Sequence, residues 1–250
     1  MMNLDYILKM EIKYLSLFSN QKQMTGGIRF QDDQQKDKYS HNLMMLHKDK
    51  VSLSELIDYE QKQCVEGFVN FRFEDTTDVS YQFLETYKKS IYGYYAAKID
   101  ELNIQVKNQA DIKRVDPFNS NDFFEFLHQE DLEFGLSYAI GNVQRQKEVL
   151  QENQHRYIFL RLLHEQKVIG HINTFIDGNT AKIDEFYVIE DYQKKGFGSA
   201  LMFQIIDLLK TNKVENVYLV TDLEDTAKQL YERYGFKLVG TYKQYQKMFT

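Results

Sequence analysis

The apolar and polar residues between 111 and 250 follow a pattern that predicts a mixed series of strands and helices. Alternating or continuous short apolar runs predict strands, and apolar spacings of three to four predict helices. Strands are expected over 111–115, 156–163, 168–176, 180–189 and 217–220, and helices over 122–132, 136–151, 198–210 and 225–234. Asp177-Gly178 is a hairpin signal, and one or two more strands follow Lys237. The expected order is βααβββαβαβ.

The first part of the chain has a less regular pattern. A helical stripe runs through residues 3–19, and Ser52-Leu53-Ser54-Glu55 resembles a capping box that opens a second helix toward Cys64. Further elements are expected as a strand over 67–73, a helical stretch over 80–89 and an aromatic segment over 91–97. Gly26-Gly27 is expected to be a turn. These residues form a small α/β unit without a recognised chemical signature.

A polar stretch without periodicity, residues 107–111, separates the two parts. We predict a linker there. The chain is therefore expected to contain an accessory α/β domain over residues 1–109 and a second domain over residues 110–250.

The composition mainly excludes certain classes of protein and partner. Hydrophobic residues make up 43% of the chain and charged residues 27%, as in ordinary globular proteins. The net charge is -6, from 31 Lys and Arg against 37 Asp and Glu, and no continuous basic stripe is present, so we expect no nucleic-acid partner. The apolar runs are short and charged residues are scattered through the N-terminus. No signal peptide, membrane span or membrane partner is therefore expected.

Cysteine and histidine usage argues against a metal or a disulfide. Cys64 is the single cysteine, which excludes an intrachain disulfide, and we expect it to be a small buried hydrophobe rather than a nucleophile. The six histidines form no HExxH motif or close ligand pair, so no metal is expected. These absences together suggest a cytoplasmic protein.

The most informative segment spans residues 186–200, where a strand runs through a glycine turn into an amphipathic helix. Gly196 and Gly198 would let backbone N–H groups approach a ligand closely, and the helix N-terminus adds the positive end of its dipole. Lys194 and Lys195 add positive charge there. This combination suits a pyrophosphate.

The glycine turn by itself also fits an ordinary tight turn. The dinucleotide-binding fingerprint would need a glycine where Leu201 stands, and the Gly-Lys-Ser/Thr of a phosphate-binding P-loop is absent. These two nucleotide-binding motifs are therefore not matched.

Two separate sequence motifs make the interpretation of this segment more specific. Residues 186–198 contain Phe-x-Val followed by Gln-x-x-Gly-x-Gly, which looks like the coenzyme A motif of the GCN5-related N-acetyltransferase (GNAT) family, Gln/Arg-x-x-Gly-x-Gly/Ala. Residues 227–236 resemble the Ala-x-x-Leu-Tyr-x-x-x-Gly-Phe segment of that family. The family usually has proline where Glu190 stands. The resemblance covers about 111–250 and implies a mixed, mostly antiparallel sheet flanked by helices.

The resemblance also implies a site for acetyl-CoA as co-substrate. The strand ending at Val188 would splay from the strand over 217–220, the pantetheine arm would enter the gap, and the Val188 N–H would polarise the thioester carbonyl. The coenzyme-binding residues are then expected to be Phe186, Val188, Gln193, Lys194, Lys195, Gly196, Phe197, Gly198 and Ser199.

Tyr231 matches the family's general acid, which protonates the leaving thiolate. Core packing is the alternative for this side chain. Glu185 is the best placed general base by resemblance, and a solvated strand face or a salt bridge is its alternative. Because strands alternate faces, only one of Asp184 and Glu185 is expected to face the substrate. Asp222 and Glu224 are further candidates, although the family often has Asn at the latter position.

The resemblance predicts an N-acetyltransferase that transfers acetyl directly from acetyl-CoA to a primary amine in a ternary complex. The acceptor could be a small molecule, for which the net charge of -6 favours a cation, or a peptide or protein amine. The alternative is a non-catalytic acyl-CoA sensor or partner-docking protein with the same fold. A homo-oligomer stays open, because one sequence does not reveal an exposed strand edge that pairs subunits.

Overall fold

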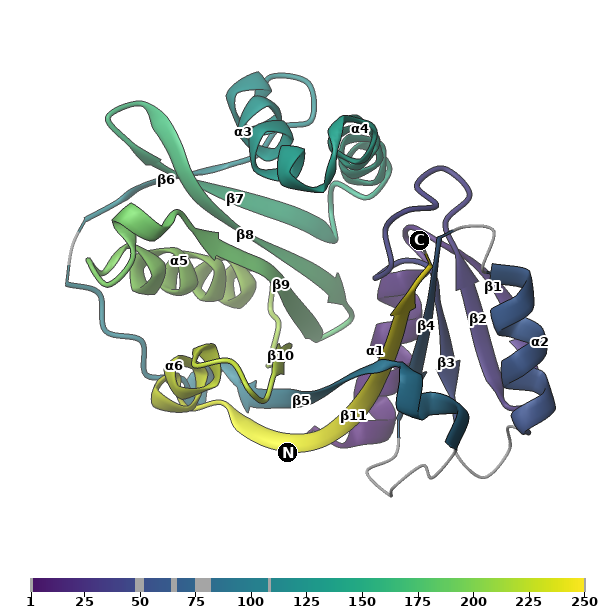
Figure 1. The fold of residues 1–250 in the computed structure, drawn as a ribbon. Helices are drawn as coiled ribbons and strands as arrows, with labels where there is room; N and C mark the ends of the chain where they lie inside the picture. Colours follow the sequence, from purple (N-terminus) through teal and green to yellow (C-terminus); the bar gives the residue numbers. More distant parts are fainter. Residues whose placement is uncertain (1, 48–51, 64–66, 75–81, 108, 250) are drawn as a thin grey trace.

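A computed structural model of the chain describes residues 2–47, 52–63, 67–74, 82–107 and 109–249. The strands in these residues form one sheet in the order β1-β2-β3-β4-β11-β5-β10-β9-β8-β7-β6 (Figure 1). Neighbouring strands run antiparallel except in the β3–β4 and β9–β10 pairs, which are parallel. The predicted α/β class with a mixed, mostly antiparallel sheet is confirmed.

The elements of the second part follow the predicted order, with ends within two residues of those expected. They are β6 (Asp111–Arg114), α3 (Asn121–Asp131), α4 (Leu136–Glu152), β7 (Tyr157–His164), β8 (Lys167–Asp177), β9 (Thr180–Val188), α5 (Phe197–Thr211), β10 (Asn216–Asp222), α6 (Ala227–Tyr234) and β11 (Lys237–Met248). One long strand, β11, stands at the C-terminus. Apolar periodicity or a short continuous apolar run thus identified each of these elements.

The first part contains α1 (Leu4–Leu15), β1 (Asn20–Met24), β2 (Gly27–Gln31), β3 (Leu43–Leu46), α2 (Leu53–Gln63), β4 (Phe68–Phe73) and β5 (Lys88–Lys98). The capping box is confirmed, because Ser52 N donates to Glu55 Oε2 (2.9 Å) and Glu55 N donates to Ser52 Oγ (3.3 Å). The expected helix over 80–89 is wrong: Gln82–Thr86 makes a 3₁₀ turn and β5 begins at Lys88. Cys64 lies outside the described residues.

The two parts of the chain repeat one topology within the shared sheet. Three antiparallel strands, a crossover helix and a parallel strand occur as β1-β2-β3-α2-β4 and again as β7-β8-β9-α5-β10. The long strand that ends each half then crosses over: β5 pairs with β10, and β11 pairs with β4. These two crossing strands join the halves in Figure 1. The boundary at 109–110 stays a prediction, and the sheet runs continuously across it.

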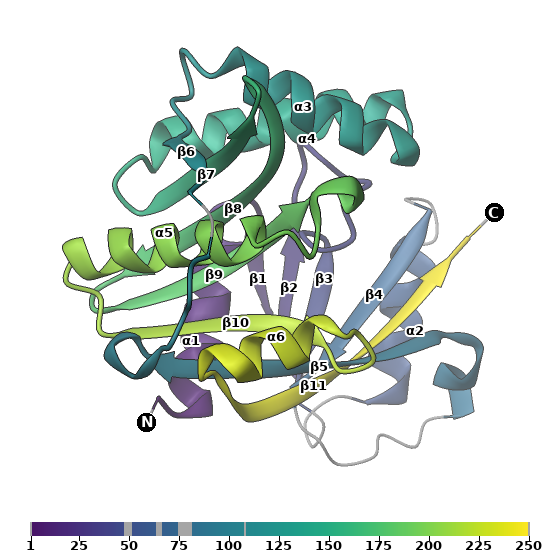
Figure 2. The same cartoon turned by 90° about the vertical axis from the view of Figure 1, so that its left-hand side faces the viewer.

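Helices cover both faces of the second half of the sheet. α5 and α6 lie on one face, where Leu201, Ile205 and Leu209 pack into a core with Ile183 and Leu219 (Figure 2). The opposite face carries α1, α3 and α4, and its separate core is rich in aromatic rings. The largest buried members of that core are Ile7, Met10, Tyr94, Phe123, Tyr157, Phe159, Phe175 and Tyr218.

A buried charge network lies where the two halves meet. Arg72 on β4 pairs with Glu74 and with Glu11 of α1 (Nη1–Oε2 3.0 Å), and its guanidinium lies 4.0 Å from the centre of the Tyr242 ring. Lys182 of β9 reaches the other Glu11 oxygen at 2.9 Å. Burial alone would raise the pKa of Glu11, but Lys182 and Arg72 lower it to about 2. The network therefore ties the N-terminal helix to strands of both halves.

Candidate active site

The two parallel strands of the second half separate before they end. β9 and β10 pair only from Thr180–Asn216 to Ile183–Leu219, while β9 continues to Val188. A β-bulge accompanies the separation, because Glu185 and Phe186 together face the single residue Ile172 of β8. Glu185 has the left-handed φ of 43°, which bends the strand at this point. The pairing of β9 with β10 therefore ends well before the C-terminal end of β9.

The predicted glycine turn follows directly. Gly196 is the N-cap of α5 with φ 88°, and no side chain within the described part of the chain caps this helix. A Cβ on Gly198 would stand 3.2 Å from the Phe186 ring, so glycine lets the helix lie against the end of β9. The free N–H groups of the first turn are thereby left for a ligand, and the helix dipole favours an anion there.

Side chains of the turn fix its shape as well as its charge. The Gln193 amide donates to the Val188 carbonyl (2.8 Å), which closes the turn onto the strand. Ser199 Oγ and Tyr234 OH lie 2.9 Å apart and join α5 to α6. The ammonium of Lys195 lies 5.6 Å from the centre of the Tyr192 ring, and Lys194 is exposed. Two lysines thus stand at the anion-binding end of the helix.

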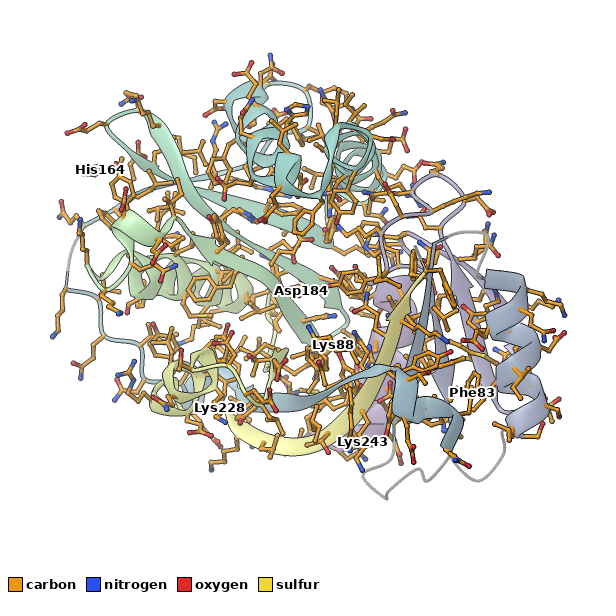
Figure 3. The ribbon with its side chains drawn as sticks, viewed as in Figure 1. Phe83, Lys88, His164, Asp184, Lys228 and Lys243 are labelled. Atoms are coloured by element: carbon orange, nitrogen blue, oxygen red, sulfur yellow. The ribbon has the colours of Figure 1, made fainter. Side chains whose placement is uncertain are left out.

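An aromatic group supports the turn from the side of β7 and β8. His164, labelled in Figure 3, contacts the rings of Tyr192 (5.3 Å) and Phe197 (5.5 Å). Tyr234 belongs to the core on the α5 and α6 face, and Tyr192 and Phe197 pack against that core.

Tyr231 belongs to α6 and approaches the end of β9 on the face of the sheet that α5 and α6 cover. Its ring lies 6.5 Å from that of Phe186 and 6.2 Å from that of Phe236, and the residue is 8% exposed. Burial raises the pKa of Tyr231 well above its ordinary value, and Asp225 and Asp184 add to the rise. The phenol therefore keeps its proton at neutral pH, as a general acid requires.

Glu185 lies on the opposite face of the sheet. Its Oε1 accepts a hydrogen bond from Gln146 of α4 (3.3 Å) and lies 3.6 Å from Lys38 Nζ. Burial raises the pKa of Glu185, and Lys38 opposes this rise. A carboxylate with a raised pKa can take a proton from an amine near neutral pH.

The expected alternation of Asp184 and Glu185 is wrong. Asp184, labelled in Figure 3, ion-pairs with Lys182 (3.3 Å), whose ammonium lies over the Tyr14 ring of α1 (4.0 Å). Glu185 also reaches this side, through Gln146. The bulge adds one residue to the strand, so two successive carboxylates point to the same face.

The other candidate carboxylates shape a turn. Asp222 Oδ1 accepts from the N–H of Glu224 (2.8 Å), and Glu224 is exposed.

His171 of β8 is 6% exposed and lies among the rings of Phe123, Phe126, Phe159 and Tyr187. Burial lowers the pKa of His171 to about 4, and the nearby Lys38 contributes to the lowering. Within the described part of the chain no partner reaches its Nδ1.

The described residues contain no group of three or more His, Cys, Asp or Glu side chains placed to hold a metal ion. None of the helices in this part of the chain has the length and apolarity needed to cross a bilayer.

Comparison with known proteins identifies the class. Residues 121–236 match the model of the acetyltransferase (GNAT) family. The chain is 41% identical over 75 residues to the uncharacterized N-acetyltransferase CgeE of Bacillus subtilis, which is 29% of either chain. It is 32% identical over 99 residues to the [ribosomal protein bS18]-alanine N-acetyltransferase of Haemophilus influenzae, 38% of this chain and 66% of the relative. The matches thus span only 29% and 66% of these curated relatives.

Solved structures extend the similarity over both halves. A functionally unknown conserved protein from Staphylococcus epidermidis has a TM-score of 0.75 at 22% identity, covering 96% of this chain and 98% of that one. A GCN5-related N-acetyltransferase from Kribbella flavida has a TM-score of 0.71 at 9% identity, with coverages of 99% and 96%. At these identities the likeness shows the fold, which includes the N-terminal half.

Proposed function

We propose that the protein is an acetyl-CoA-dependent N-acetyltransferase that acetylates a primary amine by direct attack in a ternary complex. The observation that supports this most is the separation of β9 from β10 before the C-terminal end of β9. Tyr231 approaches the end of β9 from one face of the sheet, and Glu185 lies on the other. The glycine turn follows directly after β9, so a thioester held there would lie between an acid and a base.

The coenzyme would be held mainly by the backbone. The N–H groups at the start of α5 would bind the pyrophosphate, with Lys194 and Lys195 nearby for charge. The Val188 N–H would donate to the thioester carbonyl and stabilise the oxyanion of the tetrahedral intermediate.

The reaction needs three proton transfers. Glu185 takes one proton from the ammonium form R–NH3+, and the neutral amine attacks the thioester carbonyl carbon. When the intermediate collapses, the C–S bond breaks and Tyr231 gives its proton to the coenzyme sulfur. The second proton of the attacking nitrogen then restores the Tyr231 phenol. The products are R–NH–CO–CH3, the free thiol and the proton released by Glu185.

The relative from Haemophilus influenzae is named for an alanine of a ribosomal protein. A peptide or protein amine and a small-molecule amine are both acceptor classes for the proposed reaction. The rival function, an acyl-CoA-binding protein without turnover, would use the same glycine turn but not the acid and base.

Thermal unfolding with acetyl-CoA, followed by thiol release with a panel of amines, tests the proposal. At about 100 times its dissociation constant the coenzyme stabilises the folded state by about 2.7 kcal/mol. For a chain of this size the melting temperature should then rise by about 5 to 10 °C. Thiol release with one amine class would establish acetyl transfer. A higher melting temperature without thiol release would support the binding protein. An unchanged melting temperature would rule out the coenzyme site.

Replacing Glu185 by glutamine is expected to lower kcat/KM for the amine about 10²-fold, because the amide cannot accept the proton. In the wild-type protein kcat/KM should rise with pH through the raised pKa of Glu185 as the carboxylate forms. This rise on the acid side of the pH profile, the acid limb, should disappear in the variant. Glu152→Gln, at an exposed position at the end of α4, is the matched control. Equal pH profiles for both variants would exclude Glu185 as the base.

A further inference from the structure

Lys38 brings a charge from the N-terminal half to the side of Glu185. The residue is only 7% exposed. Its Nζ donates to Asn142 Oδ1 of α4 (2.8 Å) and lies 3.6 Å from Glu185 Oε1. Asn142 Nδ2 in turn donates to Asp131 Oδ2 of α3 (2.7 Å). A buried ammonium needs such partners, so its position is defined by groups of the other half.

The loop that carries Lys38, residues 32–42, is held in one conformation by its own hydrogen bonds. Asp32 Oδ1 accepts from the N–H groups of two following residues, and Asn42 Nδ2 donates to the carbonyls of Gln35 and Lys38, both at 2.9 Å. Arg145 of α4 binds Asp32 Oδ2 (3.4 Å), which attaches the loop to the second half. These hydrogen bonds therefore define the position of the backbone at Lys38.

The other side of Glu185 is held just as firmly. Gln146, which donates to Glu185, accepts from Tyr157 OH through its Oε1 (2.8 Å). Asn173 of β8 donates to the same Tyr157 oxygen (3.2 Å). The carboxylate thus lies between a chain of neutral groups anchored in the sheet and one cation from the N-terminal half.

We propose that Lys38 is a positioning residue for the transfer reaction, which holds Glu185 as a carboxylate directed toward the acceptor. This proposal rests on the proposed function, and it gives the N-terminal half a part in catalysis. In the proposed reaction Glu185 alone exchanges a proton with the acceptor amine. Without Lys38 the carboxylate would bind its proton more tightly and would also lose one of its two anchors.

Several groups face Glu185 from the elements packed around it. Burial raises its pKa, Asp184 on its own strand and Asp131 of α3 raise it further, and Lys38 opposes them. The phenols near it come from three other elements and are Tyr14, Tyr138 and Tyr157. Lys38 is the cation that acts on Glu185, so its removal should raise the pKa of that carboxyl.

The test compares the pH dependence of kcat/KM for wild type, Lys38→Met and Lys38→Arg. The acid limb is expected to move up by about one pH unit or more in Lys38→Met, the scale of an opposite charge within about 4–6 Å. Lys38→Arg should restore its position, and the KM for acetyl-CoA should stay within about twofold, since Lys38 lies away from the glycine turn. Lys36→Met, two residues away and exposed, is the matched control.

An equal loss of rate at every pH in Lys38→Met would show a merely structural role and overturn the proposal. So would a higher KM for the acceptor with an unmoved acid limb, which would mean that Lys38 binds the substrate.

A measurement without turnover separates this proposal from the proposed function. The side-chain carboxyl carbon of Glu185 can be titrated by NMR in ¹³C-glutamate-labelled protein, with Glu185→Gln identifying its signal. Its midpoint should rise by about one unit or more in Lys38→Met. An unchanged midpoint overturns the proposal, and a raised midpoint in a protein that acetylates no amine overturns the proposed function and the catalytic role of Lys38 with it.

Discussion

Phenylalanine in place of Tyr231 is expected to lower kcat for amine acetylation roughly 10²- to 10⁴-fold, the range typical of a lost general acid. The substitution keeps the ring that packs near Phe186 and Phe236 and removes only the hydroxyl. Acetyl-CoA should therefore still raise the melting temperature as it does for wild type. Stopped assays of thiol release at saturating coenzyme and amine measure kcat directly.

Tyr95→Phe is the control for this prediction. Tyr95 is also buried, and its hydroxyl donates to Glu232 of the same helix that carries Tyr231 (3.3 Å). Losing that hydroxyl should change kcat by less than about threefold, since no proton transfer depends on it. If the two variants turn over equally fast, Tyr231 is a packing residue.

Replacing Arg72 by methionine is expected to lower the free energy of unfolding by about 3–5 kcal/mol. Arg72 is 4% exposed and pairs with Glu11 and Glu74, so the substitution would leave Glu74 buried without its cation and Glu11 with Lys182 alone. For a chain of this length the melting temperature should fall by roughly 6 to 20 °C. Denaturant and thermal unfolding followed by circular dichroism measure the change.

The loss should depend on pH in a definite direction. Burial already raises the pKa of Glu74 in the wild type, and without Arg72 it should rise further. If a carboxyl has a higher pKa in the folded state than in the unfolded state, the folded protein becomes less stable as the pH rises. The stability of the variant should therefore be closer to that of wild type at pH 5 than at pH 8. Arg114→Met, at an exposed position on β6, should change the stability by no more than about 0.5 kcal/mol. Equal effects of both variants would show that the buried network adds nothing.

The Arg72 network and Lys38 show how closely the two halves depend on each other. Arg72 joins β4 to α1, and Lys38 reaches a residue of β9 from the loop between β2 and β3. The sequence of the first half carries no recognised chemical signature. In the structure this half nevertheless places a lysine 3.6 Å from Glu185, the base of the proposed reaction.

Most of the second half could be predicted because its signals are local. The glycine turn after β9, the helix that follows it and the Tyr231 segment are each specified within about ten residues of sequence. The β3 strand was missed although its four residues are all apolar and buried, because so short an apolar run has no period that distinguishes a strand from a helix. The 3₁₀ turn over Gln82–Thr86 was read as a longer helix for the same reason.

By itself the sequence determined the order of elements in the second half, the class of fold and the glycine turn, since backbone preferences and hydrophobic periodicity act over a few residues. Only the tertiary structure decided the exchange of β5 and β11, the shared face of Asp184 and Glu185 and the approach of Lys38. The exchange and the Lys38 contact join residues more than a hundred positions apart, and the bulge depends on pairing with a neighbouring strand. No local pattern records such partners, because they are chosen by the packing of the whole chain.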